Sequence, residues 1–353
     1  MKRNAIGVED AVLLDNKLWF ILSDYKCLVS MDIETKETKS YTIPTETSYT
    51  QNRSYASMAL MGRKIYLIPF MDRVLWQFEV DSEEFIEVKL DNKFVENSSR
   101  LFMAMGTYKK FLFVMGAFTP AILRINTENN QVDYITDWTQ DIEGLLFDMD
   151  EAYFRKLSVV IGEKLYVPFC GANAVLEIDC NNMKTVIRRM GVEKQGYSGI
   201  CYDNESIWLS PRKKGSIVKW DLRNNEVNMI QIMGLDKLGN AITYAGLFYF
   251  NEEICLLPLA KRHTLHIKEK NVLELVGAYS FVQENEKHIL FYKKDNGVFT
   301  LIDKESKTQS EIEVGKVYPD MKRLICDNGN FFEESQEINI RDFIKFISFK
   351  SAE

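Results

Sequence analysis

The chain has 353 residues, of which 46% are hydrophobic and 12% aromatic, so it can bury a large core and is not a disordered protein. Its formal net charge of −7 excludes a general nucleic-acid binder, which needs an excess of Lys and Arg. No stretch approaches the roughly 18 apolar residues of a membrane span, and residues 1–10 lack the apolar run of a signal peptide. The six scattered cysteines indicate reduced, buried thiols. We therefore expect a cytoplasmic protein with no nucleic-acid or membrane partner.

One unit of four strands recurs along the chain. Each copy has an apolar run, a short turn, a second strand rich in aromatic and branched residues, a third strand ending near an Asp, and a more polar fourth strand. Four strands at a period of about 40 to 50 residues are typical of a propeller blade. The seven expected units lie near 8–43, 55–90, 100–136, 157–190, 197–232, 244–279 and 279–314.

These units predict an all-β fold, a single β-propeller domain over residues 1–353 with seven four-stranded blades. Five prolines fall at or just beyond the end of a second strand, and they are Pro69, Pro120, Pro168, Pro211 and Pro258. Because proline cannot donate a ladder hydrogen bond, each one marks where strand pairing stops.

Two segments depart from the repeat. Residues 140–156 have helix-like apolar spacing at Ile142, Leu145, Leu146 and Met149 and predict an inserted helix over one rim. Residues 323–334 resemble two further strands, and 337–349 predict a short C-terminal helix, so that 315–353 either completes the ring or packs beneath it. Six or eight blades therefore remain open alternatives to seven.

The units resemble those of kelch, WD-repeat and related bacterial propellers. The resemblance rests on strand ends such as Met31-Asp32-Ile33, Ile178-Asp179, Trp220-Asp221-Leu222 and Ile302-Asp303, together with Val80-Asp81. It implies the propeller fold over residues 8 to 314. The paired glycines of kelch repeats and the Gly-His of WD repeats are missing, so the resemblance implies no particular chemistry.

In such a propeller the loops that lead into the innermost strands share one rim with the loops that follow the second strands. Arg, Lys and Tyr are frequent in both sets. Arg forks bind carboxylates and phosphates, and Tyr offers a flat face with a polar tip. We therefore expect a small anionic or carbohydrate-like ligand, or a protein partner, at this rim. The candidate binding residues are Arg53, Tyr55, Arg100, Arg155, Tyr197, Arg212, Tyr244, Arg262 and Arg323.

The competing interpretation of these loops is that their polar residues only keep the rim solvated. No catalytic motif, phosphate loop or cofactor motif is present, and we expect no cofactor. His263 and His266 would point to opposite faces of a strand, which disfavours a metal site. The carboxylates Asp148, Asp150 and Glu151 are interpreted as a solvated helix face rather than an acid-base or calcium site. A glycan-acting enzyme and a protein-binding scaffold remain alternatives to a non-catalytic ligand-binding propeller.

Overall fold

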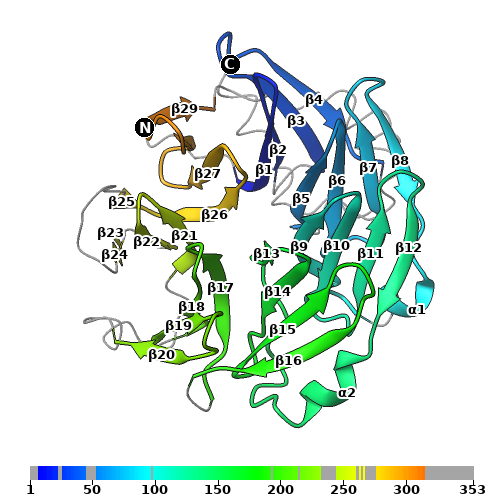
Figure 1. Ribbon diagram of the computed structural model, residues 1–353. Coiled ribbons are helices and arrows are strands. Elements are labelled where there is room, and N and C mark those ends of the chain that lie inside the picture. Colours follow the sequence, from blue (N-terminus) through cyan, green and yellow to red (C-terminus); the bar gives the residue numbers. More distant parts are fainter. Residues whose placement is uncertain are drawn as a thin grey trace, which may run out of the picture.

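The structure of the protein is a computed structural model. It describes residues 7–22, 26–44, 53–96, 98–191, 194–213, 215–231, 244–259, 262–263, 265–266 and 276–314. Within these residues no helix is long and apolar enough to cross a membrane. Sheets follow one another around a centre in chain order (Figure 1). The protein is thus a β-propeller, as the repeat predicts.

The first three blades are four-stranded antiparallel sheets built from consecutive strands. The first contains β1 (Val8–Leu14), β2 (Lys17–Leu22), β3 (Cys27–Asp32) and β4 (Thr38–Thr42). The second contains β5 (Tyr55–Met61), β6 (Lys64–Pro69), β7 (Leu75–Glu79) and β8 (Glu84–Val88). The short helix α1 (Asn92–Val95) precedes the third blade. That blade contains β9 (Phe102–Tyr108), β10 (Phe111–Gly116), β11 (Ile122–Asn126) and β12 (Gln131–Ile135).

Three further four-stranded blades follow the same order. After α2 (Trp138–Glu143) comes the blade of β13 (Val159–Ile161), β14 (Lys164–Pro168), β15 (Ala174–Asp179) and β16 (Thr185–Arg189). The next contains β17 (Tyr197–Tyr202), β18 (Ser206–Pro211), β19 (Ile217–Asp221) and β20 (Val227–Ile230). The last described blade contains β26 (Tyr279–Glu284), β27 (His288–Lys293), β28 (Val298–Asp303) and β29 (Gln309–Glu313).

The expectation of seven four-stranded blades is therefore wrong, because six such blades are described. Between β20 and β26 the chain forms a three-stranded sheet of β21 (Tyr244–Phe250), β22 (Glu253–Pro258) and β24 (Leu265–His266). The two-residue strand β23 (Arg262–His263) pairs separately with β25 (Val276–Gly277). The expected third strand is thus divided between two partners. Much of the unit expected over 244–279 lies outside the described residues.

The innermost strands form a closed ring. In sequence order each contacts the next, from β1 through β5, β9, β13, β17 and β21 to β26, and β26 contacts β1. Closure rests on non-covalent packing of the first blade against the last described one. Phe20 lies 5.4 Å from Phe299 between ring centroids, and both are fully buried in one apolar cluster. Burying each aromatic ring contributes about 2 kcal/mol.

A buried carboxylate also joins three innermost strands. Asp10 in β1 is 1% exposed, and its Oδ2 accepts hydrogen bonds from the Met58 amide of β5 at 3.0 Å and the Gln283 side chain of β26 at 2.9 Å. Burial raises the pKa of Asp10, while Lys156 nearby and these donors favour its ionised form. Asp10 therefore links the first blade to both of its neighbours.

The proline prediction is confirmed. Pro69, Pro168, Pro211 and Pro258 are the last residues of the second strands β6, β14, β18 and β22, and Pro120 follows β10. Three of them lie opposite a tyrosine that begins an innermost strand, in the pairs Tyr55–Pro69, Tyr197–Pro211 and Tyr244–Pro258. A β-bulge follows each of these tyrosines. Because a bulge bends the strand and redirects the next side chain, it separates the rim residues from the regular sheet.

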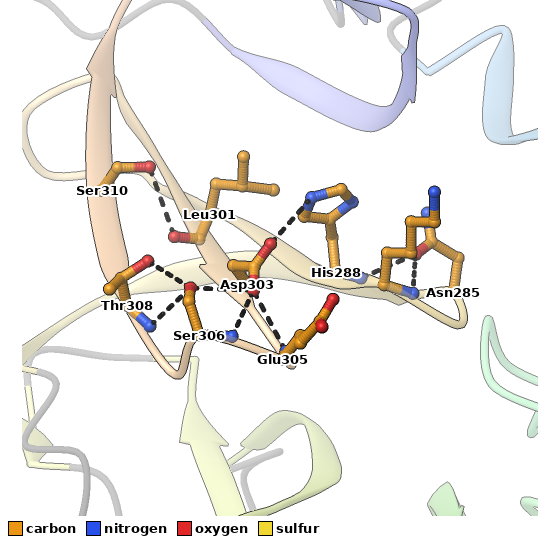
Figure 2. Close-up of polar contacts among 9 residues, drawn as sticks. Asn285, His288, Leu301, Asp303, Glu305, Ser306, Thr308 and Ser310 are labelled. Atoms are coloured by element: carbon orange, nitrogen blue, oxygen red, sulfur yellow. Dashed lines mark hydrogen bonds and ion pairs between the residues drawn. The ribbon is translucent and has the colours of Figure 1, made fainter.

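The Asp residues that end the third strands have a local structural role. The Asp303 carboxylate accepts the backbone amides of Glu305 and Ser306 at 3.0 and 2.7 Å (Figure 2). Asp32, Asp179 and Asp221 make the same two bonds to the residues two and three positions on. These bonds form Asx turns between the third and fourth strands. The Ser306 amide chiefly lowers the pKa of Asp303. The repeated Asp is thus a turn residue, not a site residue.

Both departures from the repeat differ from expectation. The helix predicted over 140–156 is the shorter α2, because Gly144 follows it and the chain then turns back toward the rim. Trp138 and Ile142 of α2 pack into the core. The C-terminal helix predicted over 337–349 and the strands predicted over 323–334 lie outside the described residues, and the described residues contain no helix after β29.

Replacing Asp10 with Ala should lower the free energy of unfolding by about 3 kcal/mol, because it leaves the Met58 amide and the Gln283 side chain without their acceptor. The comparison is Asp81→Ala, which removes an exposed ion pair with Arg63 and should cost less than about 1 kcal/mol. Chemical denaturation of both variants measures the difference. If both substitutions lower the free energy of unfolding by the same amount, Asp10 does not hold the ring together.

Candidate ligand-binding site

A cavity of about 500 Å³ opens at the centre of the ring and is named here the rim cavity. Its lining comes from the starts of innermost strands, from the loops before β5 and β13, and from the segments that follow β18, β22 and β27. The expected pairing of these two sets of loops on one rim is therefore confirmed. Five cationic side chains line the cavity, and they are Arg53, Arg155, Lys156, Arg212 and Lys294. Glu9 is the one carboxylate among the described lining residues.

Backbone hydrogen bonds hold these rim loops in place. The Tyr153 amide donates to the Ala117 carbonyl at 2.6 Å, and the Tyr197 amide donates to the Phe169 carbonyl at 2.8 Å. Each bond connects one blade to the next. The Arg212 amide in turn donates to the Gly196 carbonyl at 2.8 Å. A Cβ at position 196 would lie 1.7 Å from the Cys170 carbonyl oxygen, so this close approach requires glycine.

Glu151 joins two of the arginines. Its Oε2 lies 3.0 Å from Nη2 of Arg212, and its Oε1 lies 3.4 Å from Nη2 of Arg155. Arg212 is 6% exposed. Its Nε and Nη1 atoms, and Nε of Arg155, are buried with no hydrogen-bond partner among the described residues. A buried guanidinium donor without an acceptor is costly.

A buried thiol beside these arginines does not supply the missing negative charge. Cys170 is fully buried near Arg155 and Arg212, and burial raises the pKa of its thiol to about 12. The thiol is therefore neutral at ordinary pH. One carboxylate thus faces two guanidinium groups at this side of the cavity, which leaves one positive charge in excess.

The other cations gather near β1. Nε of Arg53 donates to Oε2 of Glu9 at 2.8 Å, and the guanidinium lies over the Phe70 ring at 5.2 Å. Lys156 donates to the Glu9 carbonyl oxygen. Desolvation lowers the pKa of Lys156 and of Lys294, and the positive charge of Arg53 lowers both further. Arg53, Lys156 and Lys294 thus lie near two carboxylates, Glu9 and Asp10, which leaves one positive charge in excess.

Arg53 adopts a strained backbone conformation. Its φ is +69°, in the left-handed region that costs a non-glycine residue about 1 to 2 kcal/mol. Twelve other described non-glycine residues also have a positive φ, so this conformation does not by itself mark Arg53 as a site residue.

The rest of the lining is largely apolar or aromatic, with Val8, Met103, Tyr244, Ala245, Leu259 and Tyr292. A volume of this size, apolar walls and a few convergent charged groups are the usual features of a small-molecule site. The arrangement can bind an anion and cover an uncharged body attached to it.

Four of the nine predicted site residues meet at this cavity, namely Arg53, Arg155, Arg212 and Tyr244. Their role in binding stays a prediction. Tyr55 is instead buried between blades, and the Tyr197 hydroxyl is bonded to Asn173 at 2.8 Å. Both pack at the bulged strand starts, where a large ring fills the space between blades.

Arg100 is exposed, with its guanidinium 5.5 Å from the Phe118 ring centroid, and does not line the cavity. The side chain of Arg262 and all of Arg323 lie outside the described residues.

Sequence reasoning did not select Glu9, Lys156 or Lys294 as site residues, and it assigned Glu151 wrongly. The three carboxylates of the insertion are not one solvated face, because Glu151 is bonded to two arginines and Asp148 pairs with Lys213 at 3.2 Å. A signal was present in the sequence, since Glu151 and Arg155 are four residues apart. The contact with Arg212 joins different blades and has no such local signal.

No group of three potential metal ligands occurs among the described residues. The side chains of His263 and His266 lie outside them. His288 lies 3.6 Å from Asp303 at the β28 turn (Figure 2), away from the cavity lining. Glu9 and Glu151 are both paired with arginines.

The fold is similar to those of several solved propellers. A catalytically inactive virginiamycin B lyase from Staphylococcus aureus with quinupristin, in which a histidine is replaced by alanine, aligns with a TM-score of 0.64 and 11% identity over 84% of this chain and 94% of the lyase chain. BamB from Moraxella catarrhalis aligns with a TM-score of 0.58 and 13% identity over 83% of this chain and 84% of the BamB chain. The RRP9 WD40 repeats align with a TM-score of 0.56 and 10% identity over 82% of this chain and 87% of the RRP9 chain. Identities this low support the fold alone.

No family model matches the chain, and no curated protein matches it. The resemblance to WD-type propellers is therefore one of blades and not of a specific family.

The unpaired donors of Arg212 predict an asymmetry in stability. Arg212→Met should change the free energy of unfolding by less than about 1 kcal/mol or raise it, because it removes buried unpaired donors at similar volume. Glu151→Gln should lower the free energy of unfolding by about 3 kcal/mol, because two guanidinium groups lose their counter-charge. Denaturation of both variants without added ligand tests this. If Arg212→Met lowers the free energy of unfolding by more than about 3 kcal/mol, Arg212 stabilises the fold and the prediction is wrong.

Proposed function

We propose that the protein binds a small anionic molecule in the rim cavity and does so without catalysis. The observation that carries the proposal is Arg212, which is 6% exposed, lines the cavity, and has no hydrogen-bond partner for Nε and Nη1 among the described residues. Proteins rarely keep buried donors unsatisfied unless a ligand or water completes them. A protein with a net charge of −7 here presents five cationic side chains to one cavity.

Glycan hydrolysis has less support. It requires two carboxyl groups roughly 5 to 9.5 Å apart with one of them able to donate a proton. The described cavity lining has Glu9 alone, and its carboxylate is bonded to Arg53. The fold similarity to a lyase does not transfer an activity at 11% identity. A carbohydrate ligand is supported only if it carries an acid group, such as a uronic acid or a sugar phosphate.

A protein partner is the second candidate, with a binding surface beside the cavity. In the insertion that carries Glu151, Phe147 is 39% exposed and Met149 72% exposed. Exposed large apolar side chains near a charged opening are typical of contact surfaces. An acidic peptide segment would use the same cations. The cytoplasmic location remains a proposal, in keeping with the five described cysteines, which are free and buried.

Isothermal titration with glucuronate, a hexose phosphate and their neutral parent sugars tests the proposal. At least one anionic compound should bind, and Arg212→Met should weaken it about tenfold or more, as expected for a charge-assisted contact worth about 1.5 to 3 kcal/mol. Arg223→Met is the matched control, because Arg223 is an exposed arginine on the β19–β20 turn paired with Glu205. Binding that is unchanged in Arg212→Met, or equal for neutral and anionic sugars, would contradict the proposal.

Binding should also depend on pH in a defined direction. Desolvation and the charge of Arg53 lower the pKa of Lys156 and Lys294, and a bound anion favours the charged form of both lysines. Affinity should therefore be greatest at neutral pH and fall as the pH rises through these lowered pKa values. Titrations from about pH 6 to about pH 10, where a carboxylate ligand stays ionised, measure it. An affinity that rises over this range would exclude charged lysines from the site.

A further inference from the structure

Two charged clusters face the rim cavity. The Arg212 cluster consists of Glu151, Arg155 and Arg212, from the loop before β13 and the segment after β18. The Arg53 cluster consists of Glu9, Arg53 and Lys294. It comes from β1, the loop before β5 and the segment after β27.

The ring places these clusters across the central channel from each other. β1 contacts β5 on one side and β26 on the other, whereas β13 and β17 contact each other three strands away from β1 in either direction. Figure 1 shows β1 and β17 on different sides of the centre. The two clusters therefore lie on opposite sides of the channel, and the Lys156 side chain reaches between them.

Each cluster has more positive than negative charge. In the Arg212 cluster two guanidinium groups share one carboxylate, and three buried guanidinium nitrogens lack partners among the described residues. In the Arg53 cluster a guanidinium and an ammonium share Glu9. Desolvation lowers the pKa of Lys294, the charge of Glu9 opposes this, and the charge of Arg53 lowers the pKa further. Each cluster would therefore be neutralised by one further negative charge.

Lys156 indicates how far apart the clusters are. It follows Arg155 in the chain, and its amino group donates to the Glu9 carbonyl oxygen while lying 5.5 Å from the Phe281 ring centroid. A lysine side chain, with its stem of four carbons, thus spans the gap between the loop before β13 and the start of β1. The cavity wall also includes the apolar or aromatic side chains of Met103, Tyr244 and Leu259.

We propose that the ligand is a diacid, with two anionic groups at the ends of a short apolar or weakly polar body. One acid group binds Arg155 and Arg212, and the other binds Arg53 and Lys294. This inference rests on the proposed anion-binding function and specifies its ligand class. Carboxylate and phosphate groups share the required chemistry, since both accept hydrogen bonds from guanidinium forks.

The test is isothermal titration of the full chain with α,ω-dicarboxylates from malonate to azelate, with hexanoate as the one-acid control and α,ω-alkylene bisphosphonates as a parallel series. We expect the affinity to be highest for a chain of about four methylene groups, because this matches the four-carbon stem of lysine. The best diacid should bind at least about tenfold more tightly than hexanoate, because the second contact is intramolecular. Comparison of the two series decides between carboxylate and phosphate groups.

Two conservative variants assign the ends. Arg212→Lys and Arg53→Lys should each reduce the best diacid to the affinity of hexanoate, and thermal melting checks that both are folded. Hexanoate has one acid group and occupies one of the two clusters. It should therefore lose affinity only in the variant that changes that cluster.

Two outcomes separate this inference from the broader proposal. If monoacids and diacids bind equally and Arg212 is still required, the diacid inference is wrong while anion binding stands. If none of these acids binds at any length, both are overturned.

Discussion

Every blade of this propeller has two faces to bury, and it can bury them only between two neighbours, so the structure depends on the ring being closed. The first blade and the last described one meet through non-covalent contacts, with Phe20 against Phe299 and Asp10 bonded across to Gln283. Dispersion and apolar burial supply most of the energy of such a contact. The Asp10 carboxylate sets its register, because a buried amide of β5 and a half-buried side-chain amide of β26 must meet the same oxygen.

Ring closure also explains where the candidate site lies. Innermost strands that all begin at one rim bring residues from distant parts of the chain around one opening, so that Glu9, Arg53 and Lys294 become neighbours. The bulges after Tyr197 and Tyr244 turn the chain away from regular pairing there. A stable framework can then hold charged groups that do not help it fold. Of the buried side-chain polar atoms without a hydrogen-bond partner among the described residues, the charged ones belong to Arg155 and Arg212, and such groups are typical of a functional site.

The sequence predicted the architecture well because the blade is a local pattern. Apolar alternation, the prolines that end second strands and the Asp turns are each encoded within a few residues, and the structure confirms them. The blade count failed where the third strand between β22 and β26 is divided between β23 and β24.

Site prediction was weaker for a different reason. Tyr55, Tyr197 and Tyr244 all pack between blades at the same rim position, but Tyr244 alone of the three also lines the cavity, and spacing along one strand cannot distinguish these outcomes. The bond from Arg212 to Glu151 joins residues 61 positions apart.

The central claim is that buried guanidinium donors of the rim cavity await an anion. The most direct measurement is the ¹H–¹⁵N spectrum of arginine Nε groups, assigned with the Arg155→Lys and Arg212→Lys variants, during titration with adipate. The account predicts that the Nε signals of Arg155 and Arg212 shift together and saturate while those of exposed Arg63 and Arg223 do not move. Shifts that are equal at all arginines, or confined to exposed ones, would show that the anion meets only the protein surface and would contradict the account.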